Sequence, residues 1–430
     1  LESLVGQAQQ AGSVAYSPQQ AEAVRAAAVS RLLIVTGGPG TGKTTILRGI
    51  LELYGRMELT ALLAAPTGRA AKRLQEVTGQ EACTIHRLLE SQPDPATGRL
   101  IFTRDEDNPL KAHAVIVDET SMVDISLLAS LLRALPPGCR LILVGDPDQL
   151  PPVGPGCPLS DMLRSGVVPA VRLTEIFRQA QESLIVMNAH RVNGGILPDL
   201  KTTTSDFFFL RRRAEEAVAA TIGDLCRTRL PDRMGIPPEE IQVLSPTRKG
   251  PTGTASLNLL LQAQLNPPSP EKKEKKWGDF SFREGDRVMQ IRNNYDILWK
   301  KTDGTQVGTG IFNGDIGIIT EIDLNAELLT VVFDDRQAEY DFDMLRELEL
   351  AYAMTVHKSQ GSEYQAVVLA AWSCAPNLRT RSVLYTAITR ARKLLVVVGR
   401  EDILQAMTEN HRRSRRYSGL KLRLQQEDRE

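Results

Sequence analysis

The residues with the clearest potential chemistry are Gly37 to Thr45, a glycine-rich segment that ends in Lys-Thr-Thr and directly follows the apolar run 32–35. A strand, a glycine-rich loop and a helix in this order favour a nucleoside triphosphate, because glycine lets several backbone N–H groups turn tightly toward the phosphates. Lys43 would place its charge near the β and γ phosphates, Thr44 would offer its hydroxyl to Mg²⁺, and the helix N-terminus would add partial positive charge. The predicted nucleotide contacts of this loop are Gly37, Gly38, Pro39, Gly40, Thr41, Gly42, Lys43, Thr44 and Thr45.

Two further strand ends carry polar residues that suit phosphate chemistry. Asp118 and Glu119 follow the apolar run 115–117, where one carboxylate can hold Mg²⁺ through water while the other orients and deprotonates the attacking water. Gln149 closes the segment Gly145 to Gln149 after another apolar run and has the reach to sense a γ phosphate. A turn-forming cluster is the alternative for this second segment, because Gly, Asp and Pro favour turns.

Composition sets outer limits on the interpretation. The chain has 430 residues, 42% of them hydrophobic and 24% charged, which indicates a soluble globular protein of two or three domains. No apolar stretch approaches the roughly 20 residues that span a bilayer and no signal-like segment opens the chain, so we expect a cytoplasmic protein without a membrane partner. The five scattered cysteines predict reduced, structural thiols, and the net charge of zero means that local patches must hold any polyanion. Because the chain begins at Leu1, we expect a fragment of a longer protein.

Strand-like and helix-like segments alternate along most of the chain, which predicts parallel sheets flanked by helices. In the first 170 residues the expected strands are 32–35, 60–65, 114–117 and 140–144. A second alternating region begins near Val171 and includes expected strands 242–244, 366–370 and 394–398. The fold class is therefore α/β with two nucleotide-binding folds, whose ligands should gather at the carboxyl ends of the strands.

Two segments break this alternation. Residues 304–340 contain short β-rich runs separated by Asn-Gly-Asp and Asp-Leu-Asn turn signals, which predicts a small β-barrel-like insertion. Residues 92–111 contain several prolines around a short apolar run and predict a β-hairpin that projects from the first sheet. A plain surface elaboration is the alternative for this hairpin.

The ordered set of motifs resembles the motifs of superfamily 1 helicases. The residues within the motifs are most similar to those of the RecD-type branch, particularly the stand-alone RecD-like enzymes. The resemblance covers residues 16 to 400 and rests on the joint order of many short motifs rather than on any one of them. The motifs are Gln20, the phosphate loop, 65–69, 84–86, 118–122, 145–151, 177–179, 285–290, 355–363 and 385–391.

The resemblance implies two RecA-like P-loop NTPase domains with a small SH3-like β insertion and a short β-hairpin pin that splits the duplex. The implied boundaries are 1–168 for the first domain with its pin at 92–111, 169–300 for the first part of the second domain, 301–345 for the SH3-like insertion and 346–430 for the remainder of the second domain.

In this family ATP lies in the cleft between the two domains, and the second domain supplies positive charge to the phosphates. Arg178 and Arg390 match the two arginines that do so, and an arginine in that position stabilises the charge on the phosphoryl oxygens in the transition state. With Lys43, Asp118, Glu119 and Gln149 they form the implied catalytic set, in which Thr44 and Asp118 hold Mg²⁺. The remaining implied ATP contacts are Gln20 at the adenine edge, Phe177 stacked on the base, Gly361 near the phosphates and Glu363 at the ribose.

The resemblance also implies a set of contacts to the backbone of single-stranded DNA. Small hydroxyls and imidazoles suit this task because they bind phosphates without reading sequence. A buried capping role is the alternative for His86, and a strand-end role is the alternative for Thr355. The implied DNA contacts are Pro66, Thr67, Thr84, His86, Pro151, Val153, Thr355 and His357.

Taken together, the resemblance implies an ATP-dependent DNA helicase with ATP and Mg²⁺ as cofactors and a role in DNA repair or recombination. It would move 5′ to 3′ on single-stranded DNA and unwind junctions that carry a 5′ overhang; a monomer would suffice. One alternative is an ATP-gated DNA-binding switch without processive unwinding. Another is a kinase or metabolic enzyme, because the fold alone permits many functions. We expect the basic segment 411–416 to be a solvated tail, and DNA binding by this segment is the alternative.

Overall fold

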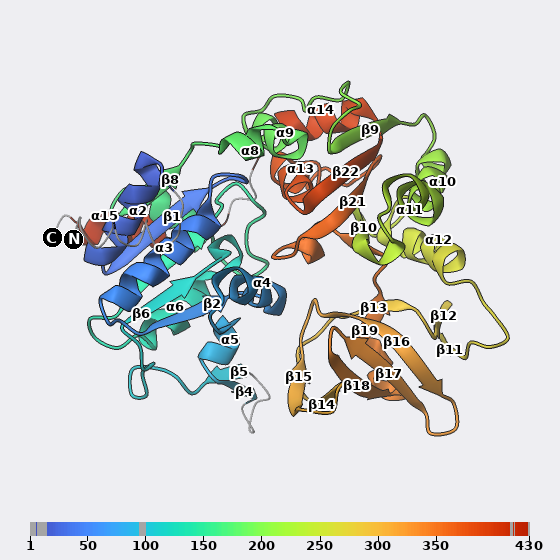
Figure 1. Ribbon diagram of the computed structural model, residues 1–430, viewed down its shortest axis with the longest axis horizontal. Helices are drawn as coiled ribbons and strands as arrows, with labels where there is room; N and C mark the ends of the chain where they lie inside the picture. The colour runs from blue at the N-terminus through green and yellow to red at the C-terminus, as the bar shows by residue number, and fades with distance from the viewer. Residues whose placement is uncertain (1–5, 7–14, 94–99, 413–415, 417, 429–430) are drawn as a thin grey trace. The chain divides into compact units, whose positions relative to one another are not determined.

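The computed structural model describes residues 6, 15–93, 100–412, 416 and 418–428. The chain divides into two compact units, one formed by residues 1–190 together with 413–430 and the other by residues 191–412. Each unit contains its own parallel sheet with flanking helices (Figure 1). Among the described residues, no helix combines the length and the apolar character that crossing a bilayer requires.

The first unit is built on a six-stranded parallel sheet with the strand order β3-β2-β6-β7-β1-β8. Alternate residues of β1 face opposite layers: Leu33 and Val35 pack with α2 and α3, whereas Ile34 packs with α6 and α7. Burial on both faces explains why these strands are continuously apolar. The strands are β1 (Leu32–Gly37), β2 (Ala61–Ala65), β3 (Ala82–Thr84), β6 (Ala114–Val117), β7 (Arg140–Gly145) and β8 (Ala170–Leu173). The helices are α2 (Pro18–Val29), α3 (Lys43–Arg56), α4 (Gly68–Thr78), α5 (Ile85–Leu88), α6 (Ile125–Arg133), α7 (Pro158–Ser165) and α8 (Arg178–Gln181).

Strand β8 belongs to the first sheet, although the sequence placed the start of the second domain at residue 169. It pairs in parallel with β1, from Ile34 opposite Ala170 to Gly37 opposite Leu173. The first unit accordingly extends to His190. The alternation of strands and helices continues unchanged through this region, so the sequence pattern does not tell which sheet a strand will join.

The second unit contains a five-stranded parallel sheet with the order β20-β10-β21-β22-β9. The strands expected at 242–244, 366–370 and 394–398 are confirmed as β10, β21 and β22, and with them the α/β class. The strands are β9 (Phe207–Arg211), β10 (Ile241–Ser245), β20 (Ala353–Thr355), β21 (Tyr364–Ala371) and β22 (Ala391–Gly399). The helices are α10 (Glu215–Asp224), α11 (Leu230–Met234), α12 (Thr254–Leu265), α13 (Arg381–Ile388) and α14 (Glu401–Glu409), and α9 (Leu184–Asn193) spans the boundary between the two units.

The β-rich insertion is a seven-stranded antiparallel sheet that is larger than the predicted 301–345. It begins at Arg287 and ends at Leu350, because β13 and β14, which both start before residue 301, and β19, which follows residue 345, complete the sheet. Its core is continuous with that of the parallel sheet: Val288, Ile319 and Leu329 belong to the same buried cluster as Val243 and Leu257. The strands are β13 (Arg287–Gln290), β14 (Asn294–Lys301), β15 (Val307–Ile311), β16 (Ile316–Asp323), β17 (Leu328–Phe333), β18 (Arg336–Asp341) and β19 (Leu348–Leu350), preceded by a separate hairpin, β11 (Glu274–Trp277) and β12 (Phe280–Arg283).

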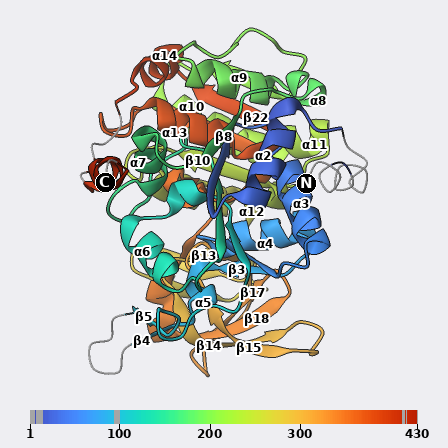
Figure 2. The same cartoon turned by 90° about the vertical axis from the view of Figure 1, so that its left-hand side faces the viewer.

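The hairpin predicted within residues 92–111 is present but short. β4 (Ser91–Pro93) pairs antiparallel with β5 (Leu100–Phe102), and residues 94–99 between them lie outside the described residues. The hairpin extends from α5 at one end of the first unit (Figures 1 and 2). Residues 103–111 do not belong to it: Arg104 pairs with Glu90 at 2.6 Å and Leu110 is buried, so this segment packs on the body of the unit.

The C-terminal segment also differs from its predicted assignment. The sequence placed all of 346–430 in the second domain and treated 411–416 as a solvated tail. In the structure, α15 (Leu420–Glu427) packs on α7 of the first unit, with Leu420 and Leu424 against its core. The Ser418 hydroxyl donates to Asp161 Oδ2 at 2.6 Å. The sequence does not predict this docking helix, because the helix is only weakly amphipathic and the residues that precede it are basic.

Candidate nucleotide site and nucleic-acid surface

The phosphate loop follows β1 and ends at the first residue of α3. Gly40 and Gly42 have φ of 73° and 81°, in the left-handed region that favours glycine. A Cβ atom at Gly42 would lie 2.3 Å from Gln20 Nε2 and 2.5 Å from Phe177 Cε2. Only glycine therefore fits where these two side chains close on the loop.

The side chain of Lys43 is held in place by hydrogen bonds to the phosphate loop. Its ammonium group donates to the carbonyl oxygens of Gly37 at 2.5 Å and Gly38 at 3.0 Å, and the Thr41 hydroxyl donates to the same Gly38 oxygen at 2.9 Å. Lys43 is also the first residue of α3, whose N-cap is a glycine. The N–H groups of the first helical turn are therefore available to an anion, and the loop and the Lys43 charge converge on the same place.

Gln20 and Phe177 come from opposite ends of the first unit's sequence and meet at Gly42. Gln20 is 1% exposed, and its Oε1 accepts from the backbone N–H of Ser17 at 3.0 Å in the capping box that starts α2. Its Nε2 is buried and has no hydrogen-bond partner among the described residues. A buried donor without a partner costs free energy, so an acceptor placed beside Gln20 Nε2 would be stabilising.

The predicted acids lie at the carboxyl end of β6, two strands from β1 in the sheet. Asp118 Oδ1 accepts from the backbone N–H of Glu119 at 2.8 Å, and Glu119 has a left-handed φ of 53°, which is strained for a residue with a side chain. Burial, followed by the charge of Glu119, raises the pKa of Asp118 to about 6, while the charges of Lys43 and Arg73 act in the opposite direction.

Gln149 is buried beyond the carboxyl end of β7, the strand that lies between β6 and β1. The hydroxyl of buried Thr120 donates to Val144 O at 2.7 Å and fixes the end of β7 beside the residues that follow Glu119. The phosphate loop, the acid pair and Gln149 thus occupy the carboxyl ends of three neighbouring strands, β1, β6 and β7. This is the edge at which a parallel sheet binds its ligand.

The two predicted arginines lie in different units and different environments. Arg178 is exposed at the start of α8 in the first unit, not in the second domain as the sequence implied, because β8 keeps this stretch with the first sheet. Arg390 is in the second unit and only 2% exposed. It donates to the carbonyl oxygens of Thr386 at 3.1 Å and Ser362 at 3.0 Å and to Thr389 Oγ1 at 3.1 Å.

Two more predicted ATP contacts lie near Arg390 at the amino ends of β21 and β22. Glu363 immediately precedes β21, and Arg390 immediately precedes β22. Glu363 Oε2 lies 3.9 Å from Arg392 Nε. Gly361 has a left-handed φ of 71°. The second unit therefore gathers Gly361, Glu363 and Arg390 at one edge of its sheet.

In the first unit, four of the predicted DNA contacts lie at the carboxyl ends of β2 and β3, which pair side by side. The Thr67 hydroxyl accepts from Ala70 N at 3.2 Å and the Thr84 hydroxyl from Arg87 N at 3.1 Å, so both cap helices. His86 lies with its ring centroid 5.8 Å from that of Phe102 on β5, and burial lowers its pKa. Pro66 precedes Thr67 in the same loop.

The loop after β7 carries the predicted DNA contacts Pro151 and Val153. Val153 is 87% exposed, the highest exposure among the large hydrophobic residues that the structure describes. The C-terminal segment holds this loop, because the Arg416 guanidinium donates to Gly154 O and the Ser418 Cβ would lie 3.4 Å from a Cβ at Gly156.

The corresponding surface of the second unit lies at the carboxyl ends of β10 and β20. Thr355 ends β20 opposite Ser245 of β10, and its hydroxyl accepts from Lys358 N at 3.4 Å; His357 follows in a short 3₁₀ turn. Sequence reasoning missed Thr247, Arg248 and Lys249, which follow β10 beside Thr355. A Thr-Arg-Lys-Gly run directly after a buried strand was the signal that could have found them.

Sequence reasoning also missed a contact to the phosphate loop. His190 Nε2 lies 2.9 Å from Pro39 O, and Ala180 Cβ would lie 2.7 Å from a Cβ at Gly40. The segment that carries α8 and α9 therefore packs directly on the loop. No motif spacing points to His190, because its place beside Pro39 arises from tertiary packing.

Comparisons with known proteins agree with this arrangement. Three family models match: an AAA domain over residues 20–155, the SH3 domain of ATP-dependent RecD-like DNA helicases over 257–333, and a UvrD-like helicase C-terminal domain over 350–398. The chain is 36% identical over 399 residues to an ATP-dependent RecD2 DNA helicase of Deinococcus radiodurans, with 93% of this chain and 51% of that protein covered. It is 31% identical over 439 residues to the RecBCD enzyme subunit RecD of Mycolicibacterium smegmatis, with 94% and 74% covered. The chain thus spans about half of the former and about three quarters of the latter.

Solved structures with the same fold include Pif1 helicases. The chain matches the Pif1 helicase from Bacteroides in complex with ADP-AlF3 and ssDNA with a TM-score of 0.52 and 20% identity, covering 92% of this chain and 94% of that one. The Pif1 helicase from Candida albicans gives a TM-score of 0.52 at 18% identity, with 93% and 97% covered. At this level of identity the likeness concerns the fold alone.

Proposed function

This chain belongs to the RecD-like family of superfamily 1 ATP-dependent DNA helicases, and on that premise we propose that it couples ATP hydrolysis to movement along single-stranded DNA and to duplex unwinding. The observation that carries the proposal is the convergence of the phosphate loop, the acid pair and Gln149 at the carboxyl ends of β1, β6 and β7. The two RecA-like units and the SH3-like insertion of the family supply the framework.

Adenine and triphosphate binding follow from the same loop. The unpartnered Gln20 Nε2 offers a donor to the adenine edge, and Phe177 offers its ring as a stacking surface, because both lie at Gly42 where the loop turns into α3. On triphosphate binding, Lys43 would exchange the carbonyl oxygens of Gly37 and Gly38 for the β and γ phosphates. The backbone N–H groups of the loop and of the first turn of α3 would hold the remaining oxygens.

The donor set fits Mg²⁺, because the Thr44 hydroxyl and the Asp118 carboxylate are the hard oxygen ligands that this cation prefers. Mg²⁺, when bound, neutralises the charge that develops on the phosphate oxygens. Glu119 would accept the proton of the attacking water, and Gln149 would orient that water and sense the γ phosphate. The strained backbone of Glu119 supports this role, since strain of this kind clusters at functional sites.

The two arginines would complete the site on nucleotide binding. Exposed Arg178 has the freedom to reach a phosphate from the unit that carries the loop. Arg390 is already fixed by Ser362 and Thr386, so it would act with little loss of side-chain entropy. Glu363 and Gly361 at the same edge would contact the ribose and the phosphates.

The DNA strand would cross the carboxyl ends of β2 and β3 in one unit and of β10 and β20 in the other. Hydroxyl, imidazole and basic groups at these ends bind phosphates without reading bases, so we expect salt-sensitive binding with little sequence preference. Movement would run 5′ to 3′, with a 5′ overhang as the loading site. The β4–β5 hairpin would act as the pin that separates the strands, and the SH3-like insertion would contact the strand on its exit side.

Strand displacement on matched duplexes tests the proposal. Duplexes with a 5′ overhang should be unwound with ATP, whereas those with a 3′ overhang or blunt ends should not. Lys43→Ala should abolish both ATPase and unwinding, and Glu119→Gln should keep nucleotide binding but stop turnover. Unwinding only from a 3′ overhang would contradict the direction of movement.

The two rival functions give different results in the ATPase assay. DNA-stimulated ATP hydrolysis without strand displacement on any substrate would indicate an ATP-gated binding switch. Hydrolysis that ignores single-stranded DNA would indicate a kinase or metabolic enzyme. No observation in the structure favours either rival over the motor.

A further inference from the structure

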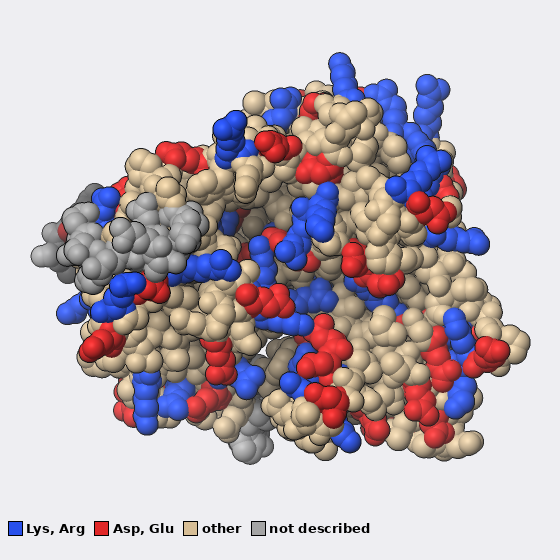
Figure 3. Space-filling model, in the orientation of Figure 1, with Lys and Arg blue, Asp and Glu red and all other residues tan. Residues whose placement is uncertain are grey.

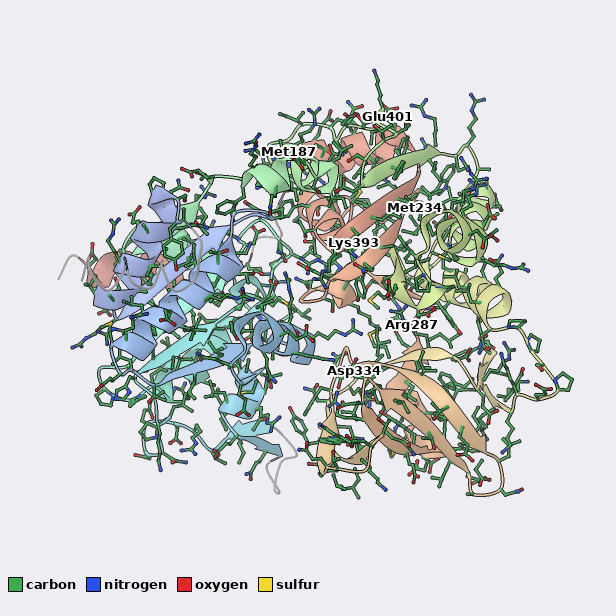
Figure 4. The ribbon with its side chains drawn as sticks, in the orientation of Figure 1. Met187, Met234, Arg287, Asp334, Lys393 and Glu401 are labelled. Carbon is green, nitrogen blue, oxygen red and sulfur yellow. The ribbon has the colours of Figure 1, made fainter. Side chains whose placement is uncertain are left out.

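A pocket of about 540 Å³ lies at the carboxyl ends of β9, β21 and β22 in the second unit, away from every residue assigned above. Figure 4 shows Glu401 of this pocket at one end of β22 and Lys393 near the other end, where Arg390 and Glu363 lie. The pocket is therefore at the opposite edge of the sheet from the proposed ATP contacts. Its lining residues are Arg211, Arg212, Arg213, Trp372, Arg400, Glu401, Asp402 and Gln405.

The backbone beneath the pocket is fixed by the sheet. Arg212 N donates to Gly399 O and Arg400 N donates to Ala371 O, both at 2.9 Å, so the loops after the three strands are tied together. A Cβ at Gly399 would lie 1.9 Å from Ala371 O, so no other residue fits at this crossing. The arginines that follow β9 and β22 therefore start from a rigid base.

Four arginines and two acids give the pocket an excess of positive charge. Arg211 pairs with Glu401, and Arg400 forms a two-pronged pair with Asp402, with Nε–Oδ1 at 2.9 Å and the second nitrogen at 2.5 Å from Oδ2. The Arg400 guanidinium also lies 5.3 Å from the ring centroid of Trp372. These pairs form the acidic rim and one aromatic wall of the pocket.

The other two arginines have no carboxylate partner among the described residues. Arg212 is half-buried, and its guanidinium is oriented by neutral acceptors, with Nε 2.7 Å from Thr221 Oγ1 and a terminal nitrogen 2.7 Å from Arg211 O. Arg213 is exposed beside it. Basic side chains gather over β9, α10 and α14 on the face shown in Figure 3. Two adjacent guanidiniums without acids, one of them already ordered, match an anion that offers paired oxygens.

The geometry points to this pocket as a second site for the phosphodiester backbone of single-stranded nucleic acid, centred on Arg212 and Arg213. The choice of nucleic acid as the ligand rests on the proposed function. The carboxyl ends of all five strands form one edge of the sheet, on which Thr355 ends β20 and the pocket begins at β21. With strands about 4.8 Å apart, β20 and β22 are on the order of 14 Å apart, a span of about two or three nucleotides.

A strand that leaves Thr355 could therefore continue along this edge to the arginines. Nucleic acid is the expected occupant rather than an acidic peptide because the pocket lies on the same edge of the sheet as Thr355, a proposed DNA contact. Glu401 and Asp402 already pair with Arg211 and Arg400, which leaves Arg212 and Arg213 to bind the phosphates. A volume of about 540 Å³ suits one or two nucleotides of a single strand rather than a duplex face.

Fluorescence anisotropy with oligo(dT) of two lengths tests this site, with about 8 nucleotides to fill the proposed main surface and about 24 to reach the pocket. The variant is Arg213→Glu, whose exposed side chain carries no fold-defining contact, and the stronger variant is Arg212→Gln combined with Arg213→Glu. The control is Arg233→Glu, the same charge change at an exposed position outside the pocket. Thermal melting checks that each variant is folded.

We expect Arg213→Glu to weaken binding of the long oligonucleotide about tenfold and to lower the slope of log affinity against log salt by about one, with the short one unchanged. Arg233→Glu should leave both unchanged. Three results of the binding assay would overturn the assignment: an unchanged affinity of Arg213→Glu for the long oligonucleotide, an equal loss of affinity for both lengths, or an equal loss in Arg233→Glu. A competition assay gives a fourth. The assignment also fails if a polyglutamate peptide displaces the long oligonucleotide from the wild-type protein but not from the variant.

The ATPase assay separates this inference from the proposed function. With the short oligonucleotide, Arg213→Glu should retain the DNA-stimulated ATPase of the wild type. If the wild-type protein shows no stimulation by either length, the proposed motor fails. If the wild-type ATPase is stimulated by DNA but Arg213→Glu binds the long oligonucleotide as tightly as the wild type, the pocket assignment fails and the proposed motor stands.

Discussion

The guanidinium of Arg390 donates to the carbonyl oxygen of Ser362 at 3.0 Å and so joins the turn before β22 to the turn before β21. The backbone N–H of Tyr364 donates back to Arg390 O at 2.8 Å. A buried guanidinium with three fixed acceptors is an ordered cation at the edge that also carries Glu363. It holds this edge together, and the proposed function gives it a second role, in which it acts on a phosphate.

Arg390→Lys separates these two roles. A lysine keeps the charge but loses the planar fork, so we expect ATP turnover to fall by on the order of a thousandfold or more. The free energy of unfolding should fall by about 1 to 3 kcal/mol because acceptors are left without donors. Steady-state ATPase and denaturant unfolding measure the two effects, and exposed Arg392→Lys is the control. Near-normal turnover in Arg390→Lys would leave Arg390 with a structural role only.

Gln20→Ala tests whether the unpartnered Nε2 awaits a base. Loss of one hydrogen bond to adenine, worth about 1 to 3 kcal/mol, should raise the KM for ATP about five- to hundredfold and remove the preference for ATP over GTP. The capping box of α2 would also lose the bond from Ser17, at a cost of about 1 kcal/mol in stability. Gln19→Ala, which removes contacts to Thr174 instead, is the matched control. An unchanged ATP to GTP ratio would exclude adenine recognition by Gln20.

Gly42→Ala and Gly79→Ala form a matched pair. Both glycines have left-handed φ, 81° and 71°, so each alanine should cost about 1 to 2 kcal/mol in backbone strain. At Gly79 a Cβ would meet nothing within 4 Å, whereas at Gly42 it would meet Gln20 and Phe177. We expect Gly79→Ala to keep full ATPase and Gly42→Ala to lose nucleotide binding, measured by titration with a fluorescent nucleotide. Equal binding by the two variants would mean that the loop does not close on Gln20 and Phe177.

Much of this site was predictable because each of its segments follows an apolar strand directly in the sequence. The phosphate loop, Asp118, Glu119 and Gln149 each follow an apolar run directly, and parallel pairing brings such strand ends to one edge. The strand that joins the first sheet as β8 was assigned to the wrong domain, because pairing partners are chosen by tertiary packing and not by local pattern. The same reason hides the contact of His190 with Pro39.

The β insertion shows a second limit of sequence reasoning. Burial alternates along β14, but its residue types do not, because the apolar residues Ile297, Leu298 and Trp299 are consecutive. Its place in the sheet therefore emerges only from its pairing with β15 and β18. The docking of α15 on α7 was equally hidden, because few apolar residues mark its buried side.

Asp286 links α12, the β11–β12 hairpin and Tyr352 in the core of the second unit. Its carboxylate accepts from Gln262 at 2.6 Å, Asn266 at 2.8 Å, Arg283 N at 2.7 Å and Tyr352 at 2.9 Å, and burial raises its pKa. Asp286→Asn would replace one accepting oxygen by an NH2 group, which would face the donors that the carboxylate now binds. We expect the free energy of unfolding to fall by about 3 kcal/mol or more. Denaturant unfolding measures this loss. Exposed Asp279→Asn should change stability by less than about 0.5 kcal/mol, and an equally mild Asp286→Asn would mean that the network is not fully formed.

The β4–β5 hairpin is expected to separate strands without taking part in ATP hydrolysis. Replacing residues 94–99 by Asn-Gly would close β4 and β5 with a two-residue turn and spare the segment from Thr103 to Leu110, which packs on the unit. We expect loss of strand displacement with DNA-stimulated ATPase within about twofold of the wild type, since the nucleotide edge lies on β1, β6 and β7. Phe102→Ala, which removes the ring beside His86, should weaken unwinding in the same direction. Full unwinding by the shortened hairpin would remove it from the mechanism, and loss of ATPase as well would show that the change reached His86 and the end of β3.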